Sequence, residues 1–397
     1  MTKSNSITAM KDEIAGYRRS MHENPQTAFE EKFASDLVAE KLTEWGIAFE
    51  RGLATTGIVA TIEGQKTDSG RTIALRADMD ALDIEEEHNK DWHSKIPGKM
   101  HGCGHDGHTA MLLGAAKYLN DTKNFNGTVH LIFQPAEEGA GGAMRMIEEG
   151  LFKKFPCDQV FGMHNWPEMP RGTIAMRPGP VMAAADRFNI TINAKGGHAA
   201  MPHHTIDPVI IGAQIVSALQ TLVSRSIAPV DPAVISVTNF NAGTGAFNVI
   251  PESAELSGTV RTFDPGVRQQ LKKRVEEIAS DIAKMHSATS TCVFGEGYDP
   301  TINTPEATEF CANIARKIVG DDNVNTDIDP CMGAEDFGAM LMEKPGCYIM
   351  MGQGENDPDS NHNQGLHTPQ YDFNDEIIPL GVEYWATLVE EALKLEK

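Results

Sequence analysis

Residues 101–108 read His-Gly-Cys-Gly-His-Asp-Gly-His, which places three histidines, one cysteine and one aspartate in eight positions. One glycine separates Cys103 from His105, so a thiolate and an imidazole can turn onto the same ion. The flanking glycines permit unusual backbone angles and leave space around the ion. Zinc and other borderline metals accept sulfur, nitrogen and oxygen ligands together. This segment therefore predicts a metal site.

Two adjacent carboxylates, Glu137 and Glu138, are the second chemical feature. Neighbouring carboxylates repel each other, so we expect one of them to bind metal and the other to act as a base with a raised pKa. Adjacent side chains on extended chain point in different directions, which suits two separate roles.

Four further polar side chains lie near the ends of strand-like runs or in a polar loop. His164 and His367 are candidate nitrogen ligands. Asp78 and Asp80 follow an apolar run, and we expect them to orient the ligands from behind.

Hydrolysis of an amide is the chemistry that these residue types suit. Two metal ions can share their charge between an attacked carbonyl and a water whose pKa they lower. A carboxylate base then takes the proton and returns it to the leaving amine. The chain shows no nucleophilic serine elbow and no glycine-rich lysine loop for phosphate.

Short apolar runs precede most of these polar side chains. They are residues 72–76, 128–134, 159–163 and 347–351. Runs of this kind that alternate with helices, such as one expected over residues 142–149, indicate βα units and a largely parallel sheet. Binding sites in open α/β sheets form at the carboxyl ends of the strands. We therefore expect the polar side chains to meet at one edge of one sheet.

The middle of the chain has a different order of elements. We expect strands at 188–194, 233–240, 254–262 and 288–295, with helices at 206–224 and 266–285. This βαββαβ order matches a ferredoxin-like α+β unit. We also expect helices near the two ends of the chain, over residues 7–46 and 376–395. The predicted fold is an α/β catalytic domain with helices on both faces of a mainly parallel sheet, formed by residues 1–185 and 298–397, with residues 186–297 inserted as a smaller domain.

The composition excludes several classes of protein. The 397 residues carry a formal net charge of -22, with 41% hydrophobic and 23% charged residues, a globular balance. Such an acidic surface repels phosphate backbones and anionic lipids, so we expect neither nucleic acid nor membrane as a partner. We identify no apolar stretch of about 18–20 residues and no signal-like N-terminus, which favours a cytoplasmic location. The six cysteines form no CxxC pair, and we expect free thiols.

The sequence resembles the dinuclear-metal aminoacylase and carboxypeptidase-like amidohydrolases. It is most similar to the branch of hippurate hydrolases, N-acyl-amino-acid amidohydrolases and auxin-conjugate hydrolases. Nine ordered motifs carry the resemblance over nearly the whole chain: residues 76–82, 101–108, 134–139, 162–165, 196–203, 248–252, 258–263, 333–337 and 367–373.

This resemblance implies a set of site residues. Two divalent ions (zinc, manganese, cobalt or nickel) would be bound by five ligands: Cys103, His105, Glu138, His164 and His367. Cys103 would bridge or nearly bridge the ions. Glu137 would be the general base, and Asp80 is counted with it among the catalytic residues.

The resemblance also implies that the inserted domain is a lid that mediates dimerisation, with pairing of dimers into tetramers left open. His198 would reach a neighbouring subunit's site and stabilise the oxyanion there. Asn248 and Arg261 would contact the substrate carboxylate or the transition state. The chain departs from the family pattern at Asp83, where proline is usual and an acidic run follows, and in residues 21–27. These departures bear on the rim of the site, and so on the substrate.

The leading hypothesis is a metal-dependent hydrolase of N-acyl-L-amino acids, with acetyl, benzoyl or similar acyl groups. The near alternatives are a metallo-carboxypeptidase or dipeptidase and an N-acetyl-diaminopimelate deacetylase-like enzyme. A thiol hydrolase that uses Cys103 with His105 would belong to a second class. A non-catalytic binding protein would be a third, and it would normally lack Glu137 or a ligand, whereas this sequence retains them all.

Overall fold

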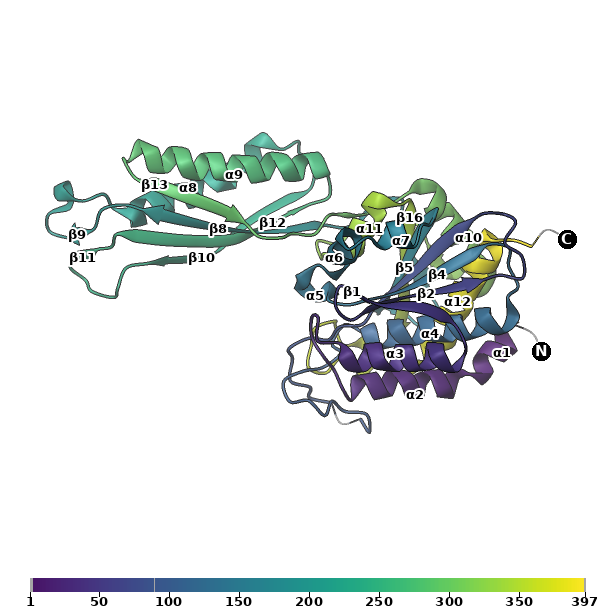
Figure 1. Ribbon diagram of the computed structural model, residues 1–397. Coiled ribbons are helices and arrows are strands. Elements are labelled where there is room, and N and C mark those ends of the chain that lie inside the picture. Colours follow the sequence, from purple (N-terminus) through teal and green to yellow (C-terminus); the bar gives the residue numbers. More distant parts are fainter. Residues whose placement is uncertain (1–2, 89, 396–397) are drawn as a thin grey trace. The chain divides into compact units, whose positions relative to one another are not determined.

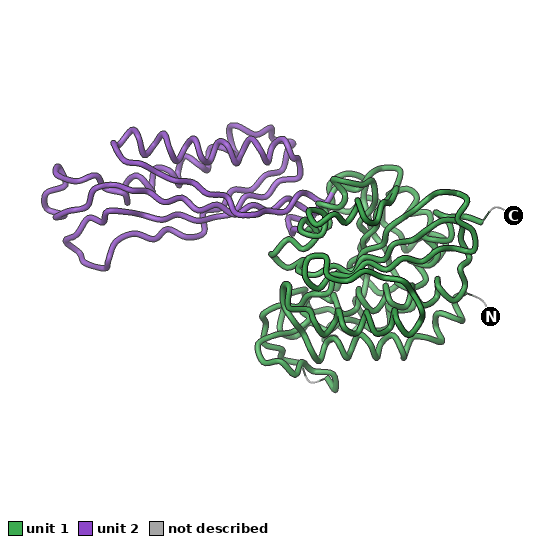
Figure 2. The backbone as a smooth tube through the Cα atoms, in the orientation of Figure 1, with its two compact units in different colours: residues 1–181, 302–329, 336–397 green, residues 182–301, 330–335 purple. Residues whose placement is uncertain are grey.

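The chain, seen in a computed structural model that describes residues 3–88 and 90–395, divides into two compact units (Figure 2). The first comprises Met1–Val181, Ile302–Asp329 and Asp336–Lys397, and the second comprises Met182–Thr301 and Pro330–Glu335. We placed the boundaries after residues 185 and 297, whereas the units change after 181 and 301. The short segment 330–335 joins the second unit because it lies beside Met182, with which Cys331 forms a β-bridge.

The first unit contains a sheet with the strand order β1-β2-β4-β3-β5-β16-β6-β15. Its strands are β1 Ala48–Leu53, β2 Gly57–Glu63, β3 Thr72–Asp78, β4 Thr128–Gln134, β5 Gln159–Pro170, β6 Ile174–Ala175, β15 Val324–Asn325 and β16 Gly346–Gly354. The central strands β4, β3, β5 and β16 pair in parallel. The β1–β2 and β2–β4 pairs are antiparallel. The predicted α/β class with a mainly parallel sheet is confirmed.

Helices cover both faces of this sheet. Figure 1 shows α2, α3 and α4 on one side and α6, α7 and α11 on the other. The helices are α1 Lys3–Ala9, α2 Lys11–His22, α3 Lys32–Glu44, α4 His105–Thr122, α5 Glu137–Ala140, α6 Gly142–Glu148, α7 Leu151–Lys154, α10 Pro305–Val319, α11 Phe337–Glu343 and α12 Ile378–Ala392. Strand β16 is buried along its whole length, as is typical of a strand covered on both faces.

The second unit is an α+β unit with a four-stranded antiparallel sheet in the order β10-β12-β8-β13. Its strands are β8 Ala184–Asn193, β10 Ala233–Ala242, β12 Ser253–Thr262 and β13 Thr289–Phe294, and its helices are α8 Pro208–Thr221 and α9 Pro265–Met285. Asp207 and Asp264 cap these helices by accepting backbone N–H groups from Val209 and Val267. The element order is the one that we expected for the inserted domain.

Shorter elements complete the described residues. They are β7 Gly179–Met182, β9 Gly197–His198, β11 Val249–Ile250 and β14 Thr301–Asn303, the 3₁₀ turns Pro202–His204, Asp321–Asn323, Asn361–Asn363 and Asp375–Ile377, and the π-helical turn Leu222–Ser226. All six cysteines are free thiols.

One helical stretch among the described residues, Pro208–Ser226, is long and apolar enough to cross a membrane by length and composition alone. Our expectation that no stretch reaches this threshold was therefore wrong. A single such helix is weak evidence for a membrane span. Ile211, Ile215 and Leu219 on this helix belong to the apolar core of the second unit.

Candidate metal centre

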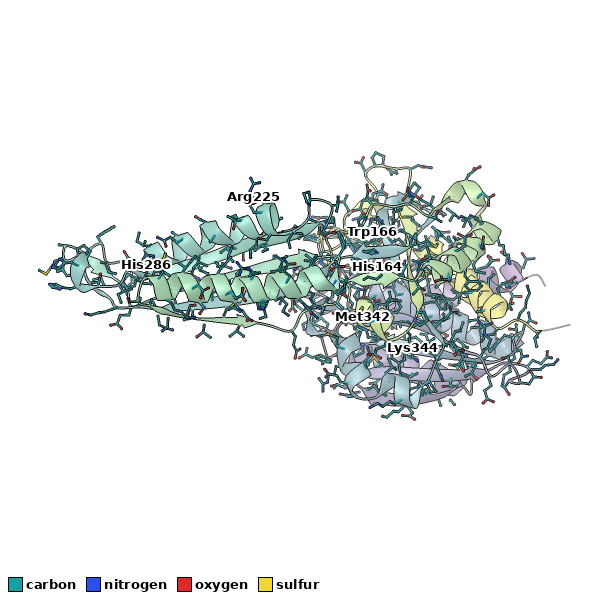
Figure 3. The ribbon with its side chains drawn as sticks, turned by 90° about the horizontal axis from the view of Figure 1, so that it is seen from above. His164, Trp166, Arg225, His286, Met342 and Lys344 are labelled. Carbon is teal, nitrogen blue, oxygen red and sulfur yellow. The ribbon has the colours of Figure 1, made fainter. Side chains whose placement is uncertain are left out.

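The predicted site residues of the first unit lie at one edge of its sheet. Asp78 is the last residue of β3, and Glu137 follows the end of β4. These strands and β5 are parallel neighbours, so their carboxyl ends share an edge. His164, which we placed after its strand, lies within β5 because that strand continues to Pro170 (Figure 3).

The five predicted ligands come together at this edge. Cys103 Sγ lies 3.3 Å from His164 Nε2, and His367 Nε2 lies 3.1 Å from Glu138 Oε1. His105 Nε2 is 4.0 Å from the same oxygen of Glu138. The donors form two groups, Cys103 with His105 and His164, and Cys103 with Glu138 and His367, each with its atoms within 4.8 Å of one another. Cys103 belongs to both groups, so it would be available to both ions.

The donor set fits divalent ions of the zinc type. A thiol, imidazole nitrogens and a carboxylate are ligands that such ions accept together. The His105 Nε2 atom is buried, and among the residues that the structure describes it has no hydrogen-bond partner. A buried nitrogen without a partner is costly unless an ion takes its lone pair. These residues could therefore hold the expected metal.

Asp80 fixes two of the ligands from behind. Its Oδ1 lies 3.2 Å from His105 Nδ1, and its Oδ2 accepts the backbone N–H of Glu138 at 2.8 Å. A carboxylate on the far nitrogen of a ligating histidine sets the ring orientation and its tautomer. Asp80 could orient both ligands in this geometry, and its role stays a prediction.

His108, the last histidine of the 101–108 motif, has both ring nitrogens engaged. Its Nδ1 lies 2.6 Å from Asp78 Oδ1, and its Nε2 accepts the backbone N–H of Asn165 at 3.1 Å. Asp78 in turn pairs with Arg76 at 2.6 Å. His108 therefore braces the strand ends rather than offering a free donor atom.

The two adjacent glutamates occupy a tight turn rather than the extended chain that we expected. Ala136 has a φ of +57°, and Glu138 departs from helical angles with φ -72° and ψ 74°. The turn still separates the two side chains, because Glu138 faces His367 whereas Glu137 Oε1 accepts the backbone N–H of Asp336 at 3.4 Å. Glu137 is buried, and its carboxylate lies in one group with His105 and Glu138.

Charge and burial set the protonation of the ligands in the absence of metal. Burial opposes a charged imidazole, but Asp78 and Asp80 outweigh it and raise the pKa of His105 to about 10. Burial and the neighbouring Glu138 raise the pKa of the Cys103 thiol well above its usual range. A catalytic thiol needs a lowered pKa, so this environment disfavours the thiol hydrolase.

Two backbone features place the ligand loops. Gly104 precedes α4 with φ +88°, and a Cβ there would meet Asn165 Oδ1 at 2.3 Å, so glycine is required. His367 has φ +64°, and its backbone N–H donates to the Gly102 carbonyl at 2.8 Å. This hydrogen bond holds the loop before α12 against the 101–108 segment.

The model of the family described as "Peptidase family M20/M25/M40" matches residues 74–391, most of the chain. The chain belongs to this family. Thermostable carboxypeptidase 2 of Saccharolobus solfataricus is 41% identical over 386 residues, covering 95% of this chain and 94% of that protein. Hippurate hydrolase of Campylobacter jejuni is 38% identical over 388 residues, covering 98% of each. These matches make the protein a metal-dependent amidohydrolase.

A solved structure extends the likeness to three dimensions. The Bacillus subtilis YXEP protein, described as a dinuclear metal binding peptidase from the M20 family, matches with a TM-score of 0.82 and 33% identity, covering 98% of this chain and 99% of that one. The family and this neighbour support divalent metal binding by the chain.

Three predicted residues of this M20-family chain lie in the second unit. Strand β9 pairs with β11 so that His198 lies opposite Val249, and the Ala199 N–H donates to the Asn248 carbonyl at 3.0 Å. The exposed His198 and Asn248 are thus close neighbours. Arg261 lies on β12, half-buried, and its guanidinium donates to Thr259. Their roles stay predictions.

Asp336 is a site residue to which we assigned no role, although it lies in the 333–337 motif. It pairs with Arg76 at 3.1 Å and accepts from Gln134 Nε2 at 2.7 Å, and all three side chains are buried. Its backbone N–H is the group that meets Glu137. Arg76 was the sequence signal that could have pointed to a residue such as Asp336, because a cation inside an apolar strand requires buried carboxylate partners.

Proposed function

We propose that this enzyme hydrolyses the amide bond of N-acyl-L-amino acids, with acetyl, benzoyl or similar acyl groups, and releases a carboxylate and a free amino acid. The observation that carries the proposal is the different environment of two adjacent carboxylates. Glu138 lies among the ligand nitrogens of His367 and His105, whereas Glu137 accepts a backbone N–H and has its carboxylate in one group with His105 and Glu138.

Each carboxylate then has one task. Two divalent ions, when bound by the five ligands, polarise the scissile carbonyl and lower the pKa of the attacking water. Glu137 takes the proton of that water and passes it to the leaving nitrogen. Asp80 keeps His105 and Glu138 in position throughout. Thiolate ligands such as Cys103 favour zinc, and imidazole ligands suit zinc and nickel, whereas manganese prefers oxygen ligands. The donor set therefore favours zinc or nickel over manganese.

The names of two relatives support an N-acyl amino acid as the substrate. One is a hippurate hydrolase and the other a carboxypeptidase, and both substrate types carry an amide whose nitrogen belongs to an amino acid with a free carboxylate. We assign binding of that carboxylate to Arg261 and Asn248. The net charge of -22 repels an anion, so the metal ions and Arg261 must supply the attraction.

We also propose a homodimer formed through the second unit, in which His198 completes the site of the partner subunit as an oxyanion donor. Two features support it. Strand β10 is an edge strand whose residues 238–242 are exposed, and such an edge is a template for pairing with another chain. The side chains of His198 and Asn248 are exposed and so available to a partner.

A substrate panel tests the reaction. The metal-loaded enzyme is assayed with N-acetyl and N-benzoyl amino acids and with dipeptides that share the same C-terminal residue, and kcat/KM is compared within each set. We expect acyl amino acids to be the better substrates and a chelator to abolish all turnover. Dipeptides cleaved much faster than every acyl amino acid would instead favour the carboxypeptidase or dipeptidase that the 41% identical relative suggests. Cleavage of N-acetyl-diaminopimelate alone would indicate the deacetylase.

A further inference from the structure

A second group of metal-binding side chains in the first unit lies outside the centre described above. His22 is the last residue of α2, and Glu86 and His88 lie in the segment between β3 and α4. The donor atoms of these three residues lie within 4.8 Å of one another, and all three side chains are buried. Glu86 belongs to the acidic run after Asp83, for which the proposed reaction has no use.

The three side chains converge on one point. Glu86 Oε1 lies 3.1 Å from His22 Nε2 and 2.6 Å from His88 Nε2. Yet among the described residues neither ring nitrogen of His88 has a hydrogen-bond partner, so this short contact lacks hydrogen-bond alignment. Two ligands that each lie about 2.1 Å from one tetrahedral ion are themselves about 3.4 Å apart. The donors already face one point, and the contact between His88 and Glu86 would widen when an ion enters.

Each of two donors is also fixed from its far side. His22 Nδ1 lies 2.9 Å from Asp106 Oδ2, and Glu86 Oε2 accepts the backbone N–H of Ser94 at 2.6 Å. A ligating histidine characteristically donates its other N–H to a carboxylate. Asp106 thus contacts the Nδ1 atom of His22 in the same way that Asp80 contacts the Nδ1 atom of His105.

The surrounding charge favours a cation at this point. Arg18 lies 3.0 Å from Asp106 but also 2.8 Å from Asp372, and all three side chains are fully buried. Lys90 Nζ also lies 3.5 Å from Asp372. The ion-pair partners of Glu86 among the described residues are the imidazoles of His22, His88 and His93, which carry no fixed charge. Buried carboxylates need a cationic partner.

A protonated His22 between Asp106 and Glu86 would explain part of this arrangement. Burial opposes its charge, but these carboxylates raise the pKa of His22 to about 9. This explanation leaves His88 Nδ1 buried without a hydrogen-bond partner among the described residues, and it leaves the 2.6 Å contact of His88 Nε2 with Glu86 out of hydrogen-bond alignment. Both features cost free energy that a bound ion would recover. The position of His88 therefore favours the ion.

We propose that His22, Glu86 and His88 bind one divalent cation of the zinc type, separate from the catalytic centre. Two imidazoles and a carboxylate are a donor set that zinc takes in proteins, with water in the fourth position. The described residues between 79 and 104 form no helix or strand, so this ion would fasten a long irregular segment to α2. Cys103 lies near the end of the same segment, just before α4. An ion that fixes this segment would therefore also help to fix the position of Cys103 in the catalytic centre.

Zinc content tests the proposal. The full chain is loaded with excess zinc and desalted, and zinc per subunit is measured by plasma mass spectrometry for wild type, His88→Asn and His130→Asn. His130 is the matched control, a buried histidine on β4 whose Nδ1 lies 2.9 Å from Thr61 Oγ1. We expect wild type and His130→Asn to retain one zinc more per subunit than His88→Asn. Equal zinc in all three folded proteins overturns the proposal.

A second measurement on the wild type avoids dependence on the folding of the variant. Crystals of the zinc-loaded chain are measured on both sides of the zinc absorption edge. We expect an anomalous peak at about 2.0–2.1 Å from both His22 Nε2 and His88 Nε2. A map with peaks at the catalytic centre and none here would overturn the proposal and leave His22 as a protonated partner of the two carboxylates.

Discussion

The two clusters of metal-binding side chains share one arrangement and differ in their access to solvent. In each, a carboxylate holds the far nitrogen of a histidine: Asp80 holds His105, and Asp106 holds His22. At the catalytic centre the side chain of His367 is 51% exposed. In the second cluster the side chains of His22, Glu86 and His88 are at most 2% exposed.

This difference separates a reacting site from a structural one. A substrate must reach the ions of a catalytic centre, and a base must stand beside them, which is the role that we propose for Glu137. Full enclosure excludes a substrate, so an ion in the second cluster would only hold chain segments together, with a buried water completing its three protein ligands. Similar ligands thus serve two purposes. Exposure to solvent and the additional carboxylate of Glu137 distinguish the catalytic centre from the structural site.

The largest effect that we expect comes from Glu137→Gln. The amide keeps the size of the side chain and an acceptor for the Asp336 N–H, but it cannot take a proton from water. We expect kcat/KM to fall by about 10²–10⁴-fold, the range for a positioned general base, with metal content unchanged. Steady-state kinetics and plasma mass spectrometry on the same preparation measure both quantities.

The matched control is Glu85→Gln, an exposed glutamate in the segment of the second cluster. It should keep the activity of the wild type. Loss of metal from Glu137→Gln would show instead that Glu137 is a ligand, and retained turnover would remove it from the role of base.

The pH dependence of metal binding should be the next largest effect. Without metal, Asp78 and Asp80 keep His105 protonated up to a pKa of about 10, and burial keeps Cys103 as a thiol. An ion must displace both protons, so its affinity rises with pH across the neutral range. Each displaced proton should raise the metal affinity about tenfold per pH unit. With two protons, the affinity of the catalytic centre should rise about a hundredfold per pH unit.

Competition with a chromophoric chelator between pH 6.5 and 8.5 measures this slope. The second cluster, where His22 is the donor with a raised pKa, should show about half the slope on a logarithmic scale. An affinity at the catalytic centre that stays constant with pH would mean that the ligands are already deprotonated.

The catalytic centre was more predictable from the sequence than the second cluster, for a physical reason. Cys103 and His105 share one short motif, and the runs before Asp78 and Glu137 have the pattern of buried parallel strands whose ends meet at one edge. The contact between His22 and Glu86 joins residues 64 positions apart, one of them in a segment without periodicity. No local pattern marks such a contact. Asp336 behind Glu137 is an intermediate case, because Arg76 inside an apolar strand indicates a buried carboxylate partner but does not say which one.

The smallest effect that we expect is that of Asp80→Asn. Asparagine keeps one oxygen for His105 Nδ1 or for the Glu138 N–H but loses the charge that favours a metal-binding imidazole. Loss of such a supporting carboxylate typically lowers metal affinity by about 10–100-fold. Activity titrated against buffered free zinc should therefore shift to higher zinc and recover near the wild-type plateau.

Asp83→Asn, at an exposed aspartate 3.6 Å from Lys99, is the control and should leave the titration unchanged. A plateau that stays low at saturating zinc would give Asp80 a part in the reaction itself, and an unshifted curve would mean that the ring of His105 is held without it.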